Sequence, residues 1–214
     1  MSAAALALTH DARRRARQGF FRDPEQLASL TREAARWARA GASEIRVWCA
    51  AAGTGEVPYS VAMVLDQVLR DSPVEFRILG TDSSTRALAF ARQARYPAAQ
   101  FAQVPLALRA RYCELASVSG NDERVVANLR LRVAFRRLSL ATQPFALRPG
   151  LDVIVCREQL GDLNTFDRRR LLAELQRVLA PGGLLLLGRG EKVEASLAGF
   201  EVLTCSVYRK VEVE

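Results

Sequence analysis

Histidine is almost absent from this sequence of 214 residues, because His10 is the single example. Catalytic triads with a histidine base and metal sites built on imidazole therefore have almost no material here. Cysteine is scarce as well, and the spacing of the four cysteines matches no pattern of metal ligands. Most of them lie in apolar segments, so we expect reduced thiols in the core. These residues are Cys49, Cys113, Cys156 and Cys205.

Long apolar runs are also missing. The apolar stretch 184–187 is far shorter than the roughly 20 residues that a membrane-spanning helix needs. A mildly apolar stretch at 3–8 precedes the first arginines, which reverses the order found in a secretory signal peptide. We therefore expect a cytoplasmic protein that does not insert into a membrane.

Lysine is rare, although the formal net charge is +8. Lys192 and Lys210 are the only lysines, so the basic excess consists almost entirely of arginine. Such a bias often reflects genome composition, and we expect no nucleic-acid partner. A cluster of arginines at 13–17, on a predicted first helix, could attract an acidic partner, but a solvated helix face would explain the same cluster.

What the sequence does contain is the composition of one soluble α/β domain. Hydrophobic residues make up 50% and charged residues 25%. Strand-like and helix-like segments alternate, which favours a parallel sheet. The predicted elements are a helix at 23–40, a strand at 45–48, a loop at 50–55, a helix at 58–70, a strand at 76–81, a helix at 84–95, a strand at 152–156, a helix at 166–179, a turn at 181–183, a strand at 184–187, and a closing hairpin or edge strand at 200–213.

The pattern changes between 97 and 133. A helix-like piece through Tyr112 precedes a turn-prone stretch at 119–122 and a run at 129–133 that alternates apolar and charged residues. We expect a small antiparallel insertion in this region.

The loop after the first predicted strand indicates a nucleotide-like ligand. Gly53 and Gly55 have no Cβ, so a ligand can approach the backbone closely. A dinucleotide fingerprint would need a third glycine where Pro58 stands, and a P-loop would need Gly-Lys-Ser/Thr. Asp82 ends the second strand, where an acid accepts hydrogen bonds from ribose hydroxyls; a capping or loop aspartate is the alternative. The combination predicts a nucleoside without a pyrophosphate.

The segment 48–60 reads Trp-Cys-Ala-Ala-Ala-Gly-Thr-Gly-Glu-Val-Pro-Tyr-Ser and resembles the nucleotide loop of the CheR-type chemotaxis receptor protein-glutamate O-methyltransferases. The Gly-Glu-x-Pro-Tyr-Ser ending is distinctive for that family. The resemblance extends from about residue 18 to the C-terminus and implies a Rossmann-like class I methyltransferase sheet with a small antiparallel β insertion. Other matching motifs, in the same order, lie at 20–23, 81–82, 91–92, 96, 111–112, 156–157 and 181–183.

The resemblance also implies roles for individual residues. Arg22 would reach the reacting side of the site, although a surface arginine at a helix start is the plainer alternative. Arg157 would contact the cofactor, or would simply pair with a carboxylate at a strand end. The cofactor would be S-adenosylmethionine (SAM) or S-adenosylhomocysteine (SAH). The implied cofactor-binding residues are Ala50, Gly53, Glu56, Asp82, Leu140 and Arg157.

For the whole chain, the resemblance implies two parts and a partner. Residues 1–40 would be a remnant of the family's helical domain, and 41–214 the methyltransferase-like domain with its β insertion at about 100–135. Some members of the family dock receptor tails on that insertion. The implied partner is an acidic helical protein such as a chemoreceptor.

The sequence departs from the family on the substrate side. The segment Cys-Arg-Asn-x-x-x-Tyr-Phe is replaced at 156–163, where Glu158 and Asp162 occupy the Asn and Tyr positions. A fixed carboxylate about 4 Å from an incoming carboxylate would cost on the order of 4 kcal/mol. Unless Arg22 or Arg189 neutralises Asp162, a glutamate substrate should be rejected. Further departures are Gln18 for a Thr, Ser139 for an Asn, and Gly-Arg-Gly-Glu at 188–191 for Gly-His-Ser-Glu.

Three hypotheses follow from these observations. The first is an active protein carboxyl methyltransferase, since an ionised carboxylate needs no general base to accept a methyl group. The second is a non-catalytic binder of SAM or SAH that regulates a chemosensory pathway. The third is a scaffold that binds no cofactor.

Overall fold

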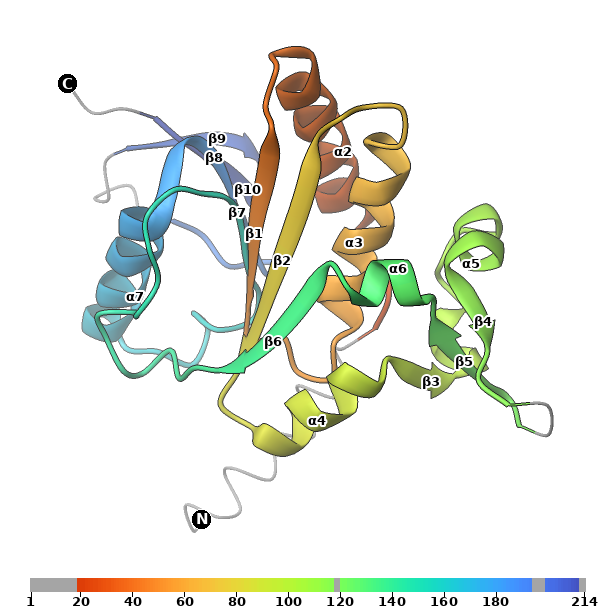
Figure 1. The fold of residues 1–214 in the computed structure, drawn as a ribbon. Helices are drawn as coiled ribbons and strands as arrows, with labels where there is room; N and C mark the ends of the chain where they lie inside the picture. The colour runs from red at the N-terminus through yellow and green to blue at the C-terminus, as the bar shows by residue number, and fades with distance from the viewer. Residues whose placement is uncertain (1–18, 118–119, 194–198, 212–214) are drawn as a thin grey trace, which may run out of the picture.

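A seven-stranded sheet forms the centre of the protein in the computed structural model, which describes residues 19–117, 120–193 and 199–211 (Figure 1). The strand order is β6-β2-β1-β7-β8-β10-β9. Neighbours from β6 to β8 pair in parallel, whereas β10 is antiparallel to both β8 and β9. The expected α/β sheet is confirmed. Its strands are β1 (Glu44–Ala50), β2 (Glu75–Asp82), β6 (Val133–Arg137), β7 (Leu151–Cys156), β8 (Leu179–Leu187), β9 (Phe200–Thr204) and β10 (Val207–Lys210).

Helices cover both faces of this sheet. The central strands carry apolar side chains on both faces, so each face needs a covering layer. Val47 and Cys49 of β1 belong to the larger core cluster, to which α2 and α3 contribute. Trp48 and Ala50 point to the other face and pack in the cluster that contains residues of α7. The helices are α2 (Pro24–Arg39), α3 (Glu56–Val68), α4 (Thr85–Gln93) and α7 (Thr165–Val178).

A small antiparallel sheet, with strand order β3-β5-β4, projects on the side of the molecule away from α7 (Figure 1). The expected insertion is thus present, but its strands lie between residues 95 and 125. Its elements are β3 (Arg95–Pro97), the 3-10 helix η1 (Ala98–Phe101), α5 (Leu106–Tyr112), β4 (Cys113–Leu115) and β5 (Asp122–Val125).

The prediction of a strand-like run at 129–133 is wrong for residues 129–132, and only Val133 lies in a strand. Residues Ala127–Arg130 form the short helix α6, which buries Leu129 and leaves Leu131 86% exposed. The chain then enters β6, which pairs in parallel with β2 in the main sheet instead of joining the insertion. An alternating run of five residues with three apolar positions does not by itself separate a strand from a helical turn, and the open edge of β2 decides the outcome.

Smaller corrections concern element ends and one cysteine. The helix predicted at 84–95 ends at Gln93, because Ala94 adopts a left-handed conformation with φ of +52°. Strand β8 begins at Leu179 and includes the residues predicted as a turn at 181–183. Cys49 and Cys156 are buried free thiols, as expected, whereas Cys205 is exposed.

Two sequence predictions lie outside the described residues: the first helix with its arginines at 13–17, and Gln18. In the part of the chain that the structure describes, no helix is both long enough and apolar enough to cross a bilayer.

Candidate functional site

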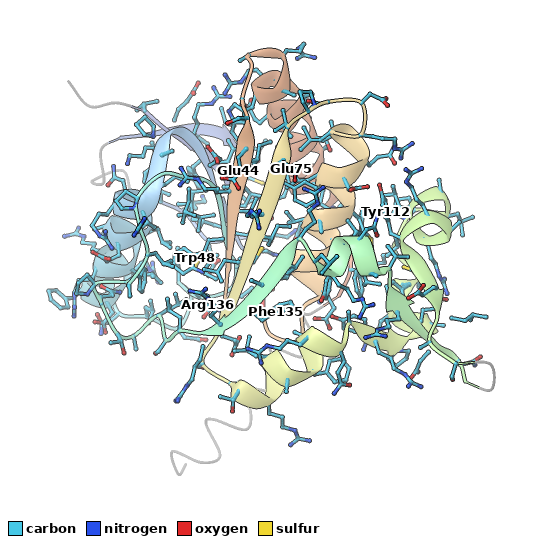
Figure 2. The ribbon with its side chains drawn as sticks, in the orientation of Figure 1. Glu44, Trp48, Glu75, Tyr112, Phe135 and Arg136 are labelled. Carbon is cyan, nitrogen blue, oxygen red and sulfur yellow. The ribbon has the colours of Figure 1, made fainter. Side chains whose placement is uncertain are left out.

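The candidate site lies at the carboxyl ends of the parallel strands, where α/β sheets usually bind ligands. Glu44 and Glu75 begin β1 and β2, and Figure 2 shows them at the end of the sheet opposite Arg136 of β6. Beneath the site, the Trp48 indole N–H donates to Thr81 Oγ1 at 2.9 Å. This bond links β1 and β2 near their carboxyl ends.

The loop between β1 and α3 is built on residues with positive φ. Gly53 has φ of +56° and Gly55 has φ of +101°. A Cβ at Gly55 would lie 2.7 Å from Tyr96 Oη and 3.0 Å from Ala91 Cβ, so the loop packs directly against α4 and β3. The Tyr96 hydroxyl donates to the carbonyl oxygen of Thr54 at 2.7 Å. Glycine is therefore required at position 55 both by its conformation and by the close approach.

Asp82 ends β2 and connects the loop after β1 to the loop after β2 at the mouth of the site. The residue is only 4% exposed. Oδ2 accepts the N–H of Gly53 at 3.0 Å, and Oδ1 accepts the N–H of Ser84 at 2.9 Å. Because a carboxylate can accept about four hydrogen bonds, it can hold these loops and also accept from ligand hydroxyls.

Glu56 is the first residue of α3 and is also buried, with 5% exposure. Thr54 Oγ1 lies 2.8 Å from each of its carboxylate oxygens. Burial raises the pKa of Glu56, and hydrogen bonds from its own backbone and from Thr54 lower that pKa in part. In its ionised form the side chain places a negative charge at the cleft, where it would attract a cationic ligand group.

These residues meet in a cleft of about 1010 Å³. Arg22, Gly53, Glu56 and Asp82 all line it. The structure therefore brings together four of the residues selected from the sequence, which lie on three separate segments of the chain.

A second cavity of about 340 Å³ adjoins the first, and Asp82 and Ser83 line both. Leu140 lines this smaller cavity together with Leu138, Leu163 and Leu171, which make much of its wall apolar. Ala50 is buried at the carboxyl end of β1, where it pairs in register with Thr81 and Cys156. It does not line either cavity.

The segment that carries Arg22 is anchored on both sides. The Phe21 N–H donates to Ser60 Oγ at 3.1 Å, and Gln26 Nε2 donates to the Leu187 carbonyl oxygen at 2.5 Å. Phe20 stacks on Phe101, with ring centroids 4.4 Å apart. These contacts fix the short stretch before α2 and present Arg22 to the cleft.

Arg157 occupies a different place from the other predicted site residues. It forms an ion pair with Asp23, which precedes α2, and the two side chains are 17% and 14% exposed. Arg157 lines a small cavity that also includes Arg22 and Ser60. The structure thus shows the carboxylate pairing that was one of the two sequence interpretations, and a contact between Arg157 and a cofactor stays a prediction.

The segment after β7 that differs from the family motif forms a loop, and the two acidic residues of this loop have different environments. Glu158 has φ of +57°, and its N–H donates to Glu191 Oε2 at 2.8 Å. Asp162 is exposed and lies outside the linings of the three cavities described. Near bulk water, two charges 4 Å apart interact by only about 1 kcal/mol, so the repulsion expected from Asp162 is weaker than a buried position would give.

Sequence reasoning missed Tyr96 and Glu191, which support the loops around the site. Tyr96 matched a family motif, but nothing local indicates that its hydroxyl reaches the Thr54 carbonyl. Glu191 stood in a recognised turn, yet its partners are on the loop after β7.

Comparison with known proteins gives a family match over most of the chain. Residues 17–209 match the family model described as "CheR methyltransferase, SAM binding domain". "Chemotaxis protein methyltransferase 2" of Pseudomonas aeruginosa is 33% identical over 176 residues, which cover 80% of this chain and 61% of that protein. "Chemotaxis protein methyltransferase" of Escherichia coli is 31% identical over 80% of this chain and 59% of its own length.

A third relative is named for a different process. "Probable biofilm formation methyltransferase WspC" of Pseudomonas putida is 34% identical over 80% of this chain and 40% of its own length. The chain spans about three fifths of the length of the Pseudomonas aeruginosa and Escherichia coli proteins and 40% of the length of the Pseudomonas putida protein.

Proposed function

Because this chain belongs to the CheR methyltransferase family, we propose that it binds SAM at Asp82 and Glu56 and transfers the methyl group to glutamate carboxylates of a chemoreceptor. The observation that carries the proposal is the buried Asp82 carboxylate, which accepts backbone N–H groups from both loops of a cleft of about 1010 Å³. A cleft of this size is at the upper end of the usual range for small-molecule sites.

The lining of the two cavities suits the separate parts of SAM. Asp82 lies between them and would accept hydrogen bonds from the ribose hydroxyls. The smaller cavity, with Leu140 on its apolar wall, would hold a flat base. Glu56 would face the cationic end of the cofactor, since a buried carboxylate is stabilised by a nearby positive charge.

The chemistry requires little more from the protein than placement. Bound SAM would supply a methyl group on a positively charged sulfur. A glutamate side chain has a pKa of about 4.3, so it is already ionised at neutral pH and needs no general base. Holding the two reactants in line can then provide several kcal/mol of the rate enhancement. Arg22, on its anchored segment, would orient the carboxylate by a charge-assisted hydrogen bond.

The partner we propose is an acidic helical segment of a chemoreceptor, reached from the cytoplasm. A formal net charge of +8 favours such a partner by long-range attraction. We also propose that residues 1–40 form a helical extension, and that 41–214 form the methyltransferase domain whose insertion holds the small sheet.

Titration calorimetry with SAM and with SAH tests the cofactor part of the proposal. The wild-type protein should bind both, and Asp82→Asn should weaken binding by about 100-fold, because hydrogen bonds to a charged acceptor contribute roughly 1.5–3 kcal/mol each. Asp71→Asn is the matched control, since Asp71 is exposed on a turn away from the cleft. Equal affinities for the two variants would contradict the assignment of Asp82.

Methyl transfer is tested with SAM that carries a labelled methyl group and an acidic helical receptor fragment. Carboxyl methyl esters release labelled methanol in alkali, and the wild-type protein should form them. Binding of SAH without any ester would favour the alternative, a non-catalytic regulatory binder of the chemosensory pathway. The absence of both binding and transfer would leave only the scaffold.

A further inference from the structure

Glu191 lies in the turn after β8, and its carboxylate accepts hydrogen bonds from several backbone N–H groups. Oε2 accepts from Gly188 at 2.7 Å and from Glu158 at 2.8 Å, and Oε1 accepts from Leu160 at 2.6 Å. The residue is only 9% exposed. Charge-assisted bonds of this kind are stronger than neutral ones, so the carboxylate joins the turn after β8 to the loop after β7.

The loop needs this support because of its own conformation. Glu158 has φ of +57°, a left-handed conformation that residues other than glycine rarely adopt. The junction also has no spare room. A Cβ at Gly188 would lie 2.6 Å from Glu191 Oε2 and 2.7 Å from the Glu158 nitrogen.

The loop contributes to both sides of the candidate site. At its start, Arg157 pairs with Asp23, the residue after Arg22. Farther along, Gln159 and Leu163 line the smaller cavity. A shift of this loop would therefore move groups on the substrate side and on the cofactor side together.

We propose that Glu191 is a positioning residue for methyl transfer, which acts by holding loop 157–163 and touches neither substrate nor cofactor. This inference rests on the proposed function. Glu191 lies outside the linings of the three described cavities, which is consistent with an indirect role. Strands β7 and β8 pair through their own register, so release of the loop should leave the sheet intact.

Two variants test the junction from its two sides. Glu191→Gln keeps the shape of the side chain but replaces one acceptor oxygen by an NH2 group, which cannot accept an N–H. Gly188→Ala keeps the carboxylate and inserts a methyl group between Glu191 and the Glu158 nitrogen. Leu175→Ala is the control: it removes buried side-chain volume from α7, and its site lies outside the loop and the described cavities.

Amide hydrogen exchange and kinetics are the readouts. In Glu191→Gln and Gly188→Ala, exchange at the Glu158 and Leu160 amides should rise by about tenfold or more, while amides of β7 and β8 stay protected. We expect kcat to fall by about 100-fold, because a displacement of about 1 Å can have that effect, and SAH should bind more weakly. Leu175→Ala should lower Tm and leave those two amides and kcat near their wild-type values.

Two results would overturn the inference. One is wild-type kcat and SAH affinity in both junction variants. The other is a loss of kcat in Leu175→Ala that matches the loss in Glu191→Gln, which would make the effect one of general stability. Failure of the proposed function looks different: the wild-type protein itself would neither bind SAH nor transfer methyl groups, and a role for Glu191 in the reaction would fall with it.

Discussion

Two buried carboxylates at the cleft have different surroundings. Asp82 accepts N–H groups from two loops, whereas Glu56 contacts the Thr54 hydroxyl and has its pKa raised by burial. A raised pKa means that folding destabilises the charged form of Glu56 relative to the neutral form. Glu56 is therefore expected to reduce the stability of the ligand-free protein while it serves the bound cofactor.

Glu56→Gln should raise the stability of the ligand-free protein at neutral pH and weaken SAM binding by about tenfold. A gain of about 1 kcal/mol would raise Tm by roughly 2–4 °C in a protein of this size. The folded pKa lies above the unfolded one. The destabilisation is thus fully present above the folded pKa and disappears as pH falls through it toward about 4.3. Thermal melts of both proteins across this range would show their Tm values converge.

Glu114→Gln is the matched control for that comparison, since Glu114 is exposed on β4. It should leave both Tm and SAM affinity close to the wild-type values at every pH. A Tm difference between Glu56→Gln and wild type that stays constant with pH would contradict the role given to ionisation.

At the scale of elements, the site depends on how closely the loop after β1 packs against α4 and β3. Gly55 contacts Ala91 and Tyr96 at this junction, and the Tyr96 hydroxyl binds the Thr54 carbonyl oxygen. Gly41, after α2, has a similar backbone conformation with φ of +83° but nothing within 4 Å of an added Cβ. The two glycines therefore separate backbone strain from packing.

Gly55→Ala should destabilise the protein more than Gly41→Ala. Both variants place a side chain in the left-handed region, at roughly 1–2 kcal/mol. Gly55→Ala adds overpacking against Tyr96, which typically contributes about 1–3 kcal/mol more. Denaturant unfolding would measure the difference, and SAH titration should show weaker binding for Gly55→Ala alone. Equal unfolding free energies would mean that the loop and β3 do not pack as tightly as the structure shows.

For the molecule as a whole, the positive charge affects association more than folding. Net charge steers encounters with partners of opposite charge and is screened by salt. With a formal charge of +8, the chain should meet an acidic receptor segment faster than a neutral one.

The association rate with an acidic helical receptor fragment should fall by roughly tenfold when the ionic strength rises from about 0.01 M to about 0.15 M. Stopped-flow fluorescence on a labelled fragment would measure it. SAH carries no net charge, so its affinity should change little over the same range. A rate that does not depend on salt would argue against an acidic partner.

Much of the fold and part of the site can be predicted from local patterns. The apolar residues of β1, the acid that ends β2 and the glycines between β1 and α3 can be identified from the sequence, because neighbours along the chain determine them. Gly53 and Asp82 were selected in this way and Glu56 from the family resemblance, and the structure places all three at one cleft. Element ends were harder, since they depend on single backbone conformations such as that of Ala94.

Tertiary structure alone decided the contacts between distant segments. The sequence shows an arginine at 157 and a glutamate at 191, but not that one pairs with Asp23 or that the other binds the backbone of Glu158 and Leu160. The exposure of Asp162 was equally hidden from sequence. The reason is that the environment of a charged group depends on which distant loops fold over it, whereas strand and helix periodicity depends on neighbours along the chain.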